Sequence, residues 1–219
     1  MLFGVATWAP AVGAVLGGPM MGELLEFAHR QAGVRKVSRV ALIGYSAGCQ
    51  RVRALYLSGV RASAYLLADG THASWPPEEW QIGWLRDIAS EARAGKALLV
   101  ATHTQQGYTE RLPQGKAFCS TALVLRMATG WPLDRAGLLD APVVTREGAL
   151  YVYSYASADI DAPVHVAQLV RVVPELSARH LGPWVAQQGW PAAPPPRSLL
   201  AFGLLGIFAA LMFTSSPRA

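Results

Sequence analysis

Apolar runs of strand length alternate along most of the chain with segments whose apolar positions recur every three to four residues. Unbroken apolar runs are typical of strands buried on both faces, and their alternation with helices favours a mainly parallel sheet flanked by helices. The pattern predicts strands at 2–7, 37–45, 62–68, 96–102 and 149–155, and helices at 21–32, 47–58, 76–94, 118–129 and 165–173. The predicted fold class is therefore α/β.

The C-terminal part of the chain has a different pattern. Residues 198–217 contain no charged residue, and residues 199–213 (LLAFGLLGIFAALMF) are apolar throughout. A helix of about 20 residues spans the roughly 30 Å of a bilayer core. The sequence thus predicts a domain at 1–185, a proline-rich linker at 186–197 and a transmembrane-like helix at 198–214 that anchors the protein in a membrane. The alternative is a hydrophobic helix docked on a partner or on a second copy.

The N-terminal residues 1–22 are also uncharged, but they lack a basic n-region, and their glycines and prolines suit a strand and a loop. Without an export signal, the domain is expected on the cytoplasmic side. Arg197 and Arg218 flank the apolar segment evenly, so the positive-inside rule leaves the side of the membrane open.

Composition narrows the classes of function. Hydrophobic residues make up 52% of the chain and charged residues 15%, so a large core is available and disorder is excluded. The net charge of +5 comes from 19 Lys and Arg against 14 Asp and Glu, spread singly along the chain, and no nucleic-acid partner is expected. Cys49 and Cys119 cannot form a disulfide framework, and nothing around them has metal-ligand spacing. Neither a metal nor a cofactor is predicted.

The motif Gly44-Tyr45-Ser46-Ala47-Gly48 lies between the apolar strand 37–45 and the following helix. A G-x-S-x-G in this position is typical of a nucleophile elbow, in which a tight turn presents the serine hydroxyl at the start of a helix. Ser46 is therefore the predicted nucleophile. The alternative is a glycine-rich connection without chemistry.

An activated serine needs a base and a group that orients the base. His165 lies in the last strand-to-helix connection, downstream of the serine, and is the predicted base. Asp69 ends the strand that follows the elbow and is the predicted acid, with Asp159 and Asp161 as alternatives. His72 and His103 also follow strands and are predicted to shape the pocket or bind substrate, as is Tyr45. A metal shared by the two histidines lacks a third ligand.

The oxyanion of the reaction needs backbone N–H donors. The N–H of Ala47, directly after the nucleophile, is the first expected donor, and Trp8 in the loop after the first strand is the second.

The segments GYSAG, LLADGTHASW and LLVATHTQQGY, followed by His165 before VAQLVRVVPEL, resemble the α/β-hydrolase superfamily over residues 1–185, and in particular a group of bacterial α/β-hydrolases. The resemblance implies a serine esterase or lipase-like enzyme with Ser46, His165 and Asp69 as its triad and with no cofactor. The chain departs from the superfamily because it lacks the leading antiparallel strands and an obvious lid, and because it has a C-terminal apolar segment.

These observations predict a membrane-tethered serine hydrolase that cleaves a carboxylic ester, or less readily an amide, through an acyl-enzyme. A small-molecule ester or a lipid or cell-envelope ester is the expected substrate class. The first alternative is a catalytically silent scaffold of the same fold, used for assembly in a phage or envelope complex. The second is a lysis protein whose C-terminal helix disrupts membranes.

Overall fold

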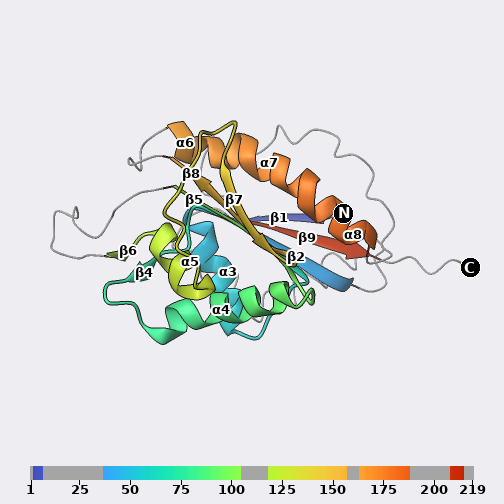
Figure 1. Cartoon of the computed structure of the whole chain (residues 1–219). Coiled ribbons are helices and arrows are strands. Elements are labelled where there is room, and N and C mark those ends of the chain that lie inside the picture. The colour runs from blue at the N-terminus through green and yellow to red at the C-terminus, as the bar shows by residue number, and fades with distance from the viewer. Residues whose placement is uncertain (1, 7–36, 105–117, 157–162, 188–207, 215–219) are drawn as a thin grey trace, which may run out of the picture.

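The computed structural model describes residues 2–6, 37–104, 118–156, 163–187 and 208–214. Within these residues, seven strands form one sheet in the order β1-β9-β2-β3-β5-β8-β7 (Figure 1). The strands are β1 (Leu2–Ala6), β2 (Val37–Tyr45), β3 (Ala64–Ala68), β5 (Leu98–Thr104), β7 (Val143–Glu147), β8 (Leu150–Tyr155) and β9 (Phe208–Thr214). Two short strands, β4 (Ala73–Ser74) and β6 (Phe118–Cys119), pair with each other outside this sheet.

The sheet is mixed, which corrects the expectation of a mainly parallel one. β2, β3, β5 and β8 are parallel to one another and form its centre. β9 is antiparallel to both β1 and β2, and β7 is antiparallel to β8. The apolar runs therefore do not report strand direction, because they occur in the parallel central strands and also in β1 and β9, which pair antiparallel.

Helices cover the two faces of the sheet (Figure 1). α3 (Gly48–Leu57), α4 (Glu79–Arg93) and α5 (Thr121–Thr129) lie on one face. A long helical segment, 163–187, lies on the other. It consists of α6 (Pro163–Ala167), α7 (Val173–Leu176) and α8 (Gly182–Gln187), joined by π-helical turns at Gln168–Val172 and Ser177–Leu181. The prediction of an α/β fold is confirmed.

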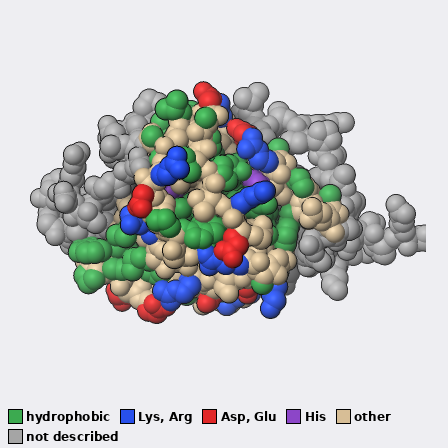
Figure 2. Space-filling view, in the orientation of Figure 1, with side chains coloured by type: hydrophobic (Ala, Val, Ile, Leu, Met, Phe, Trp, Pro, Cys, Tyr) green, Lys and Arg blue, Asp and Glu red, His purple; other side chains and the backbone are tan. Residues whose placement is uncertain are grey.

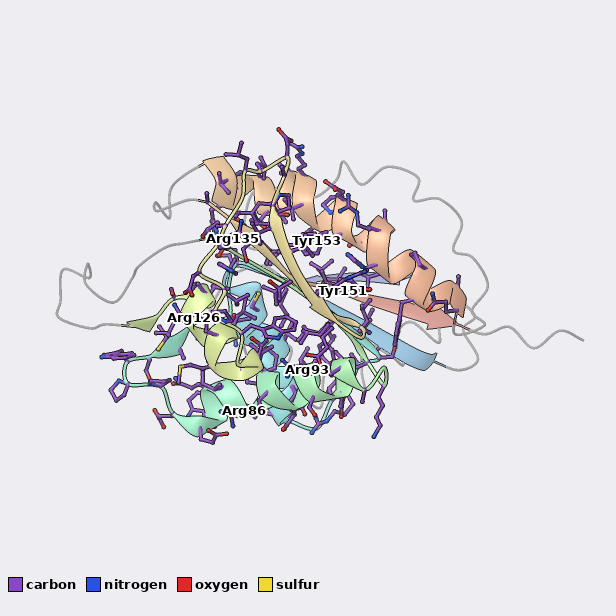
Figure 3. All side chains as sticks on the ribbon, viewed as in Figure 1. Arg86, Arg93, Arg126, Arg135, Tyr151 and Tyr153 are labelled. Carbon is purple, nitrogen blue, oxygen red and sulfur yellow. The ribbon has the colours of Figure 1, made fainter. Side chains whose placement is uncertain are left out.

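Successive side chains of the central strands enter two separate cores. In β3, Tyr65 and Leu67 pack with α3, α4 and α5, whereas Leu66 and Ala68 pack with the helical segment 163–187. Tyr151 and Tyr153 of β8 lie against this same segment (Figure 3), and the Tyr153 hydroxyl lies 2.7 Å from His180 Nε2. Because both faces are buried, every position of β3 is apolar, and the strand shows no alternation of apolar and polar residues.

Several element boundaries differ from the sequence-based expectation. The sequence pattern does not predict β7, because this edge strand ends in Arg146 and Glu147 and is mostly exposed. The helix expected at 118–129 begins at Thr121, since the Ser120 side chain accepts a hydrogen bond from the Leu123 N–H and caps it. The helix expected at 165–173 continues to Gln187. The helix expected at 21–32 lies outside the described residues.

The C-terminal segment gives the largest correction. Residues 208–214, expected in a membrane-spanning helix, form β9, and the strand completes the sheet between β1 and β2. An apolar run is compatible with either a buried strand or a helix, and only its length favoured the helix. Pairing on both sides satisfies the backbone of β9 as a helix would. Residues beyond the predicted linker thus pair with the sheet. Residues 198–207 lie outside the described part, and membrane attachment stays a prediction.

None of the helices in the described ranges is both long enough and apolar enough to cross a bilayer. On the face in Figure 2, the described basic and acidic side chains are interspersed. Ion pairs that link such groups include Arg86 with Glu79 and Arg93 with Glu147. The described part of this face presents no continuous basic surface of the kind that a phosphate backbone requires.

Candidate active site

Ser46 lies in the turn between β2 and α3 and has a left-handed backbone with φ of +50°. A non-glycine residue rarely adopts this conformation, and strained backbone of this kind is concentrated at functional sites. The turn is tight: a methyl group at Gly44 would lie 2.9 Å from both the N and Cα of Cys49. The Ser46 N–H donates to the Ala68 carbonyl at 2.9 Å, which fixes the turn on the end of β3.

Asp69 follows β3 directly and also has a left-handed backbone, with φ of +44°. Its N–H donates to the Thr102 carbonyl at 3.2 Å. The next residue, Gly70, packs on the elbow so closely that a methyl group there would lie 1.8 Å from the Ser46 carbonyl oxygen. The backbone of the predicted nucleophile therefore contacts the residues on both sides of the predicted acid, Ala68 and Gly70.

The Asp69 carboxylate is buried and fully engaged. Thr104 donates to it twice, from its N–H to Oδ1 at 3.1 Å and from its hydroxyl to Oδ2 at 2.9 Å. His165 Nδ1 lies 2.8 Å from Oδ2. Burial alone would raise the pKa of Asp69, but the hydrogen bonds from His165 and Thr104 outweigh it and hold the pKa below its usual value. The group is a carboxylate at neutral pH.

His165 lies in α6, and its side chain is 16% exposed. In the neutral tautomer whose Nδ1 donates to Asp69, Nε2 is the nitrogen that can accept a proton. Tyr45, the residue before Ser46, contacts the histidine twice: its hydroxyl donates to the His165 carbonyl at 3.0 Å, and the two ring centroids are 5.0 Å apart. The ends of β2, β3 and β5 and the start of α6 thus meet on one side of the molecule (Figure 1).

The structure brings Asp69 and His165 into hydrogen-bond contact and fixes Ser46 beside Asp69. Within the described part of the chain, the Ser46 hydroxyl forms no hydrogen bond with His165. The alternative acids, Asp159 and Asp161, lie outside the described residues.

Ala47 is the N-cap residue of α3, directly before Gly48, and has a helical backbone. Its N–H is one of the amides at a helix start that have no partner within the helix, so it can donate to an anion above the turn. Trp8, the second predicted oxyanion donor, lies outside the described residues.

The three predicted substrate contacts differ in accessibility. His72 is partly exposed; its carbonyl accepts from Arg53 at 3.1 Å, and its Nδ1 lies 3.5 Å from the Thr121 hydroxyl. Tyr45 is 7% exposed, and its hydroxyl is used on His165. His103 has no exposed surface, and its Nε2 lies 2.7 Å from Ser154 Oγ. The buried His103 ring offers no surface to a substrate in this structure, and its role in shaping the pocket stays a prediction.

We expect His103 to make stability depend on pH. Burial lowers its pKa, and so the unfolded chain binds a proton below about pH 6.5 that the folded protein excludes. As the pH is lowered from about 6.5 to the pKa of His103 in the folded state, the free energy of unfolding should then fall. For this one proton the fall is at most about 1.4 kcal/mol per pH unit. His72 and His180, whose pKa values burial also lowers, act in the same direction.

Urea unfolding at about pH 7.5 and about pH 5 should therefore show a smaller loss of stability in His103→Gln than in the wild type. An equal loss in both proteins would show that His103 takes up a proton without unfolding.

Sequence reasoning missed the hydroxyl residues that support the site. Thr104 engages the Asp69 carboxylate, and the Thr102 hydroxyl donates to Gln168 Oε1 at 2.7 Å. The available signal was two threonines on either side of His103 at the carboxyl end of a buried strand. Within the described residues, no group of three His, Cys, Asp or Glu side chains could hold a metal ion.

The fold and this site define an α/β protein with a strained serine turn beside a buried aspartate–histidine pair. No protein-family model matches the chain, and no curated protein or solved structure matches it either.

Proposed function

We propose that the chain is a serine hydrolase with a compact α/β-hydrolase fold that cleaves a carboxylic ester. The main support is the 2.8 Å contact between His165 Nδ1 and Asp69 Oδ2, formed by residues 96 positions apart and next to the left-handed turn at Ser46. A buried carboxylate that orients a histidine beside a strained serine is the arrangement from which acyl transfer proceeds.

In the proposed reaction, Ser46 Oγ attacks the ester carbonyl, and its proton passes to His165 Nε2. The Asp69 carboxylate stabilises the resulting imidazolium, and the Ala47 N–H donates to the tetrahedral oxyanion. The C–O bond to the alcohol then breaks, the alcohol leaves with the proton from His165, and an acyl-enzyme remains. Water, deprotonated by the same histidine, releases the acid and regenerates Ser46.

Attack requires Ser46 Oγ and His165 Nε2 to come within about 2.6–3.2 Å, a contact that often tightens only when substrate binds. The contact between His165 Nδ1 and Asp69 Oδ2 is already formed without substrate. The identity of the acyl and alcohol parts of the ester stays a prediction. Small-molecule esters and lipid or cell-envelope esters are the expected classes.

Labelling with a fluorophosphonate probe tests the proposal, because such probes modify only activated serines. The full chain should be used, since truncation at the proline-rich linker removes β9 from the sheet. We expect stoichiometric labelling of the wild type and none of Ser46→Ala. Ser58→Ala, an exposed serine after the same helix, is the matched control and should label like the wild type.

Labelling that persists in Ser46→Ala would contradict the assignment of the nucleophile. A folded wild type, verified by circular dichroism, that does not label would favour the catalytically silent scaffold.

A further inference from the structure

The helical turn that contains His165 is attached to the sheet at two points besides the bond to Asp69. The first is Tyr45. Its hydroxyl donates to the His165 carbonyl, and its ring packs on the imidazole. Because Tyr45 directly precedes Ser46, this contact links the backbone of the base to the elbow.

The second attachment is between Thr102 and Gln168. The Thr102 hydroxyl donates to Gln168 Oε1 at 2.7 Å, and neither residue has any exposed surface. Thr102 also accepts the Asp69 N–H through its carbonyl. Gln168 lies three residues after His165, so the two side chains are on neighbouring parts of one helix face. This contact therefore links the base to the strand end that also fixes the acid.

Two features of Gln168 are unfavourable for stability alone. Its Nε2 is buried without a hydrogen-bond partner, which a leucine or methionine at this position would avoid. It also begins a π-helical turn, a rare geometry that occurs frequently at functional sites. The buried, unpaired Nε2 is explained if the amide oxygen is needed for the contact with Thr102.

We infer that Tyr45, Thr102 and Gln168 are positioning residues that fix the helical turn at 165–168, so that His165 Nδ1 stays on Asp69 and Nε2 points toward Ser46. The assignment rests on the proposed function. It also replaces substrate binding as the main role of Tyr45, whose hydroxyl is already engaged.

The test compares Tyr45→Phe and Thr102→Val, each of which removes one hydroxyl with little change of volume. Hydrolysis of p-nitrophenyl acetate should show kcat reduced about three- to tenfold in each, the effect of one lost hydrogen bond, with KM little changed. Thr102→Ser keeps the hydroxyl and should retain most of the wild-type kcat.

Two control variants remove buried hydroxyl contacts elsewhere. Tyr65→Phe removes the acceptor of the Ala62 N–H, and Thr129→Val removes a hydrogen bond to the Leu125 carbonyl. Both should leave kcat within about twofold of the wild type, even if they lower stability as much as the test variants. An unchanged kcat in both test variants, or a rise in KM alone, would overturn the positioning role.

A second readout does not depend on catalysis. The imidazole proton shared with Asp69 should give a downfield proton NMR signal in the wild type that Asp69→Asn abolishes. We expect this signal to broaden or shift in Tyr45→Phe and Thr102→Val but not in Tyr65→Phe. If the wild type hydrolyses no ester and the signal still responds, the proposed function fails and the positioning role stands. An unchanged signal in both test variants overturns the positioning role, whether or not the enzyme is active.

Discussion

Asp69→Asn should slow ester hydrolysis about 10³- to 10⁴-fold while leaving the fold intact, the effect seen when an orienting aspartate is replaced by its amide. The asparagine occupies the same space but has one acceptor oxygen where Asp69 has two. Thr104 donates to both oxygens of Asp69, and His165 needs one of them. The amide NH₂ would therefore face His165 or Thr104, and facing His165 it would favour the tautomer in which Nε2 already carries the proton.

Initial rates of ester hydrolysis, measured with unfolding curves on the same samples, test this prediction. Asp87→Asn is the matched control, because Asp87 is exposed and lies outside the site, where its contact is with the Tyr56 hydroxyl. It should keep wild-type rates. A loss of less than about tenfold in Asp69→Asn would mean that another group orients the base.

The second large effect is expected for Gly70→Ala. The added methyl group would lie 1.8 Å from the Ser46 carbonyl oxygen and 2.5 Å from its carbon. Both are backbone atoms within the elbow, so neither can rotate away, and the turn itself has to move. We expect a loss of about 3 kcal/mol in the free energy of unfolding and a fall in kcat of at least about 100-fold, because displacement of the nucleophile by about 1 Å is enough for such a fall.

Gly182→Ala is the control for this substitution. Gly182 has a helical backbone, and a methyl group there meets no atom within 4 Å apart from its chain neighbours. The helix propensity of alanine is opposed by the restriction that Pro183 places on the residue before it, so the variant should stay within about 1 kcal/mol of the wild-type stability and keep its activity. Urea unfolding and initial rates measure both effects. If Gly70→Ala has a stability and a kcat near the wild-type values, the loop after β3 can shift to accommodate the methyl group without displacing Ser46.

The parts of the fold that sequence reasoning predicts are those that depend on local pattern. β2, β3, β5 and β8 are unbroken apolar runs because both of their faces are buried, and the serine turn follows from glycines on either side of Ser46. The contact between Asp69 and His165 could be expected because parallel strands end on one side of a sheet. These inferences need no knowledge of distant packing.

The parts that sequence reasoning misses depend on contacts between distant segments. Nothing local distinguishes the strand at 208–214 from half of an apolar helix, because the difference lies in its pairing with β1 and β2. The hydrogen bond between Thr102 and Gln168 cannot be predicted from the sequence either, since a single hydroxyl and a single amide produce no periodic pattern. The π-helical turn that begins at Gln168 alters the helical register after His165, and no propensity scale predicts it.

The position of β9 has a consequence for how the protein folds. Ala41 of β2 pairs with Leu211, across most of the length of the chain. Such a contact closes a very large loop, and contacts of high sequence separation form slowly because their entropic cost comes before their gain. The strand that leads into the Ser46 turn thus acquires one of its two neighbours through a pairing of residues 170 positions apart, and among the strand pairings of this sheet only that of β1 with β9 spans more of the chain. During refolding, helix content should return before the reactivity of Ser46 with a fluorophosphonate probe. The interval between the two would measure the time that β9 needs to pair with β1 and β2.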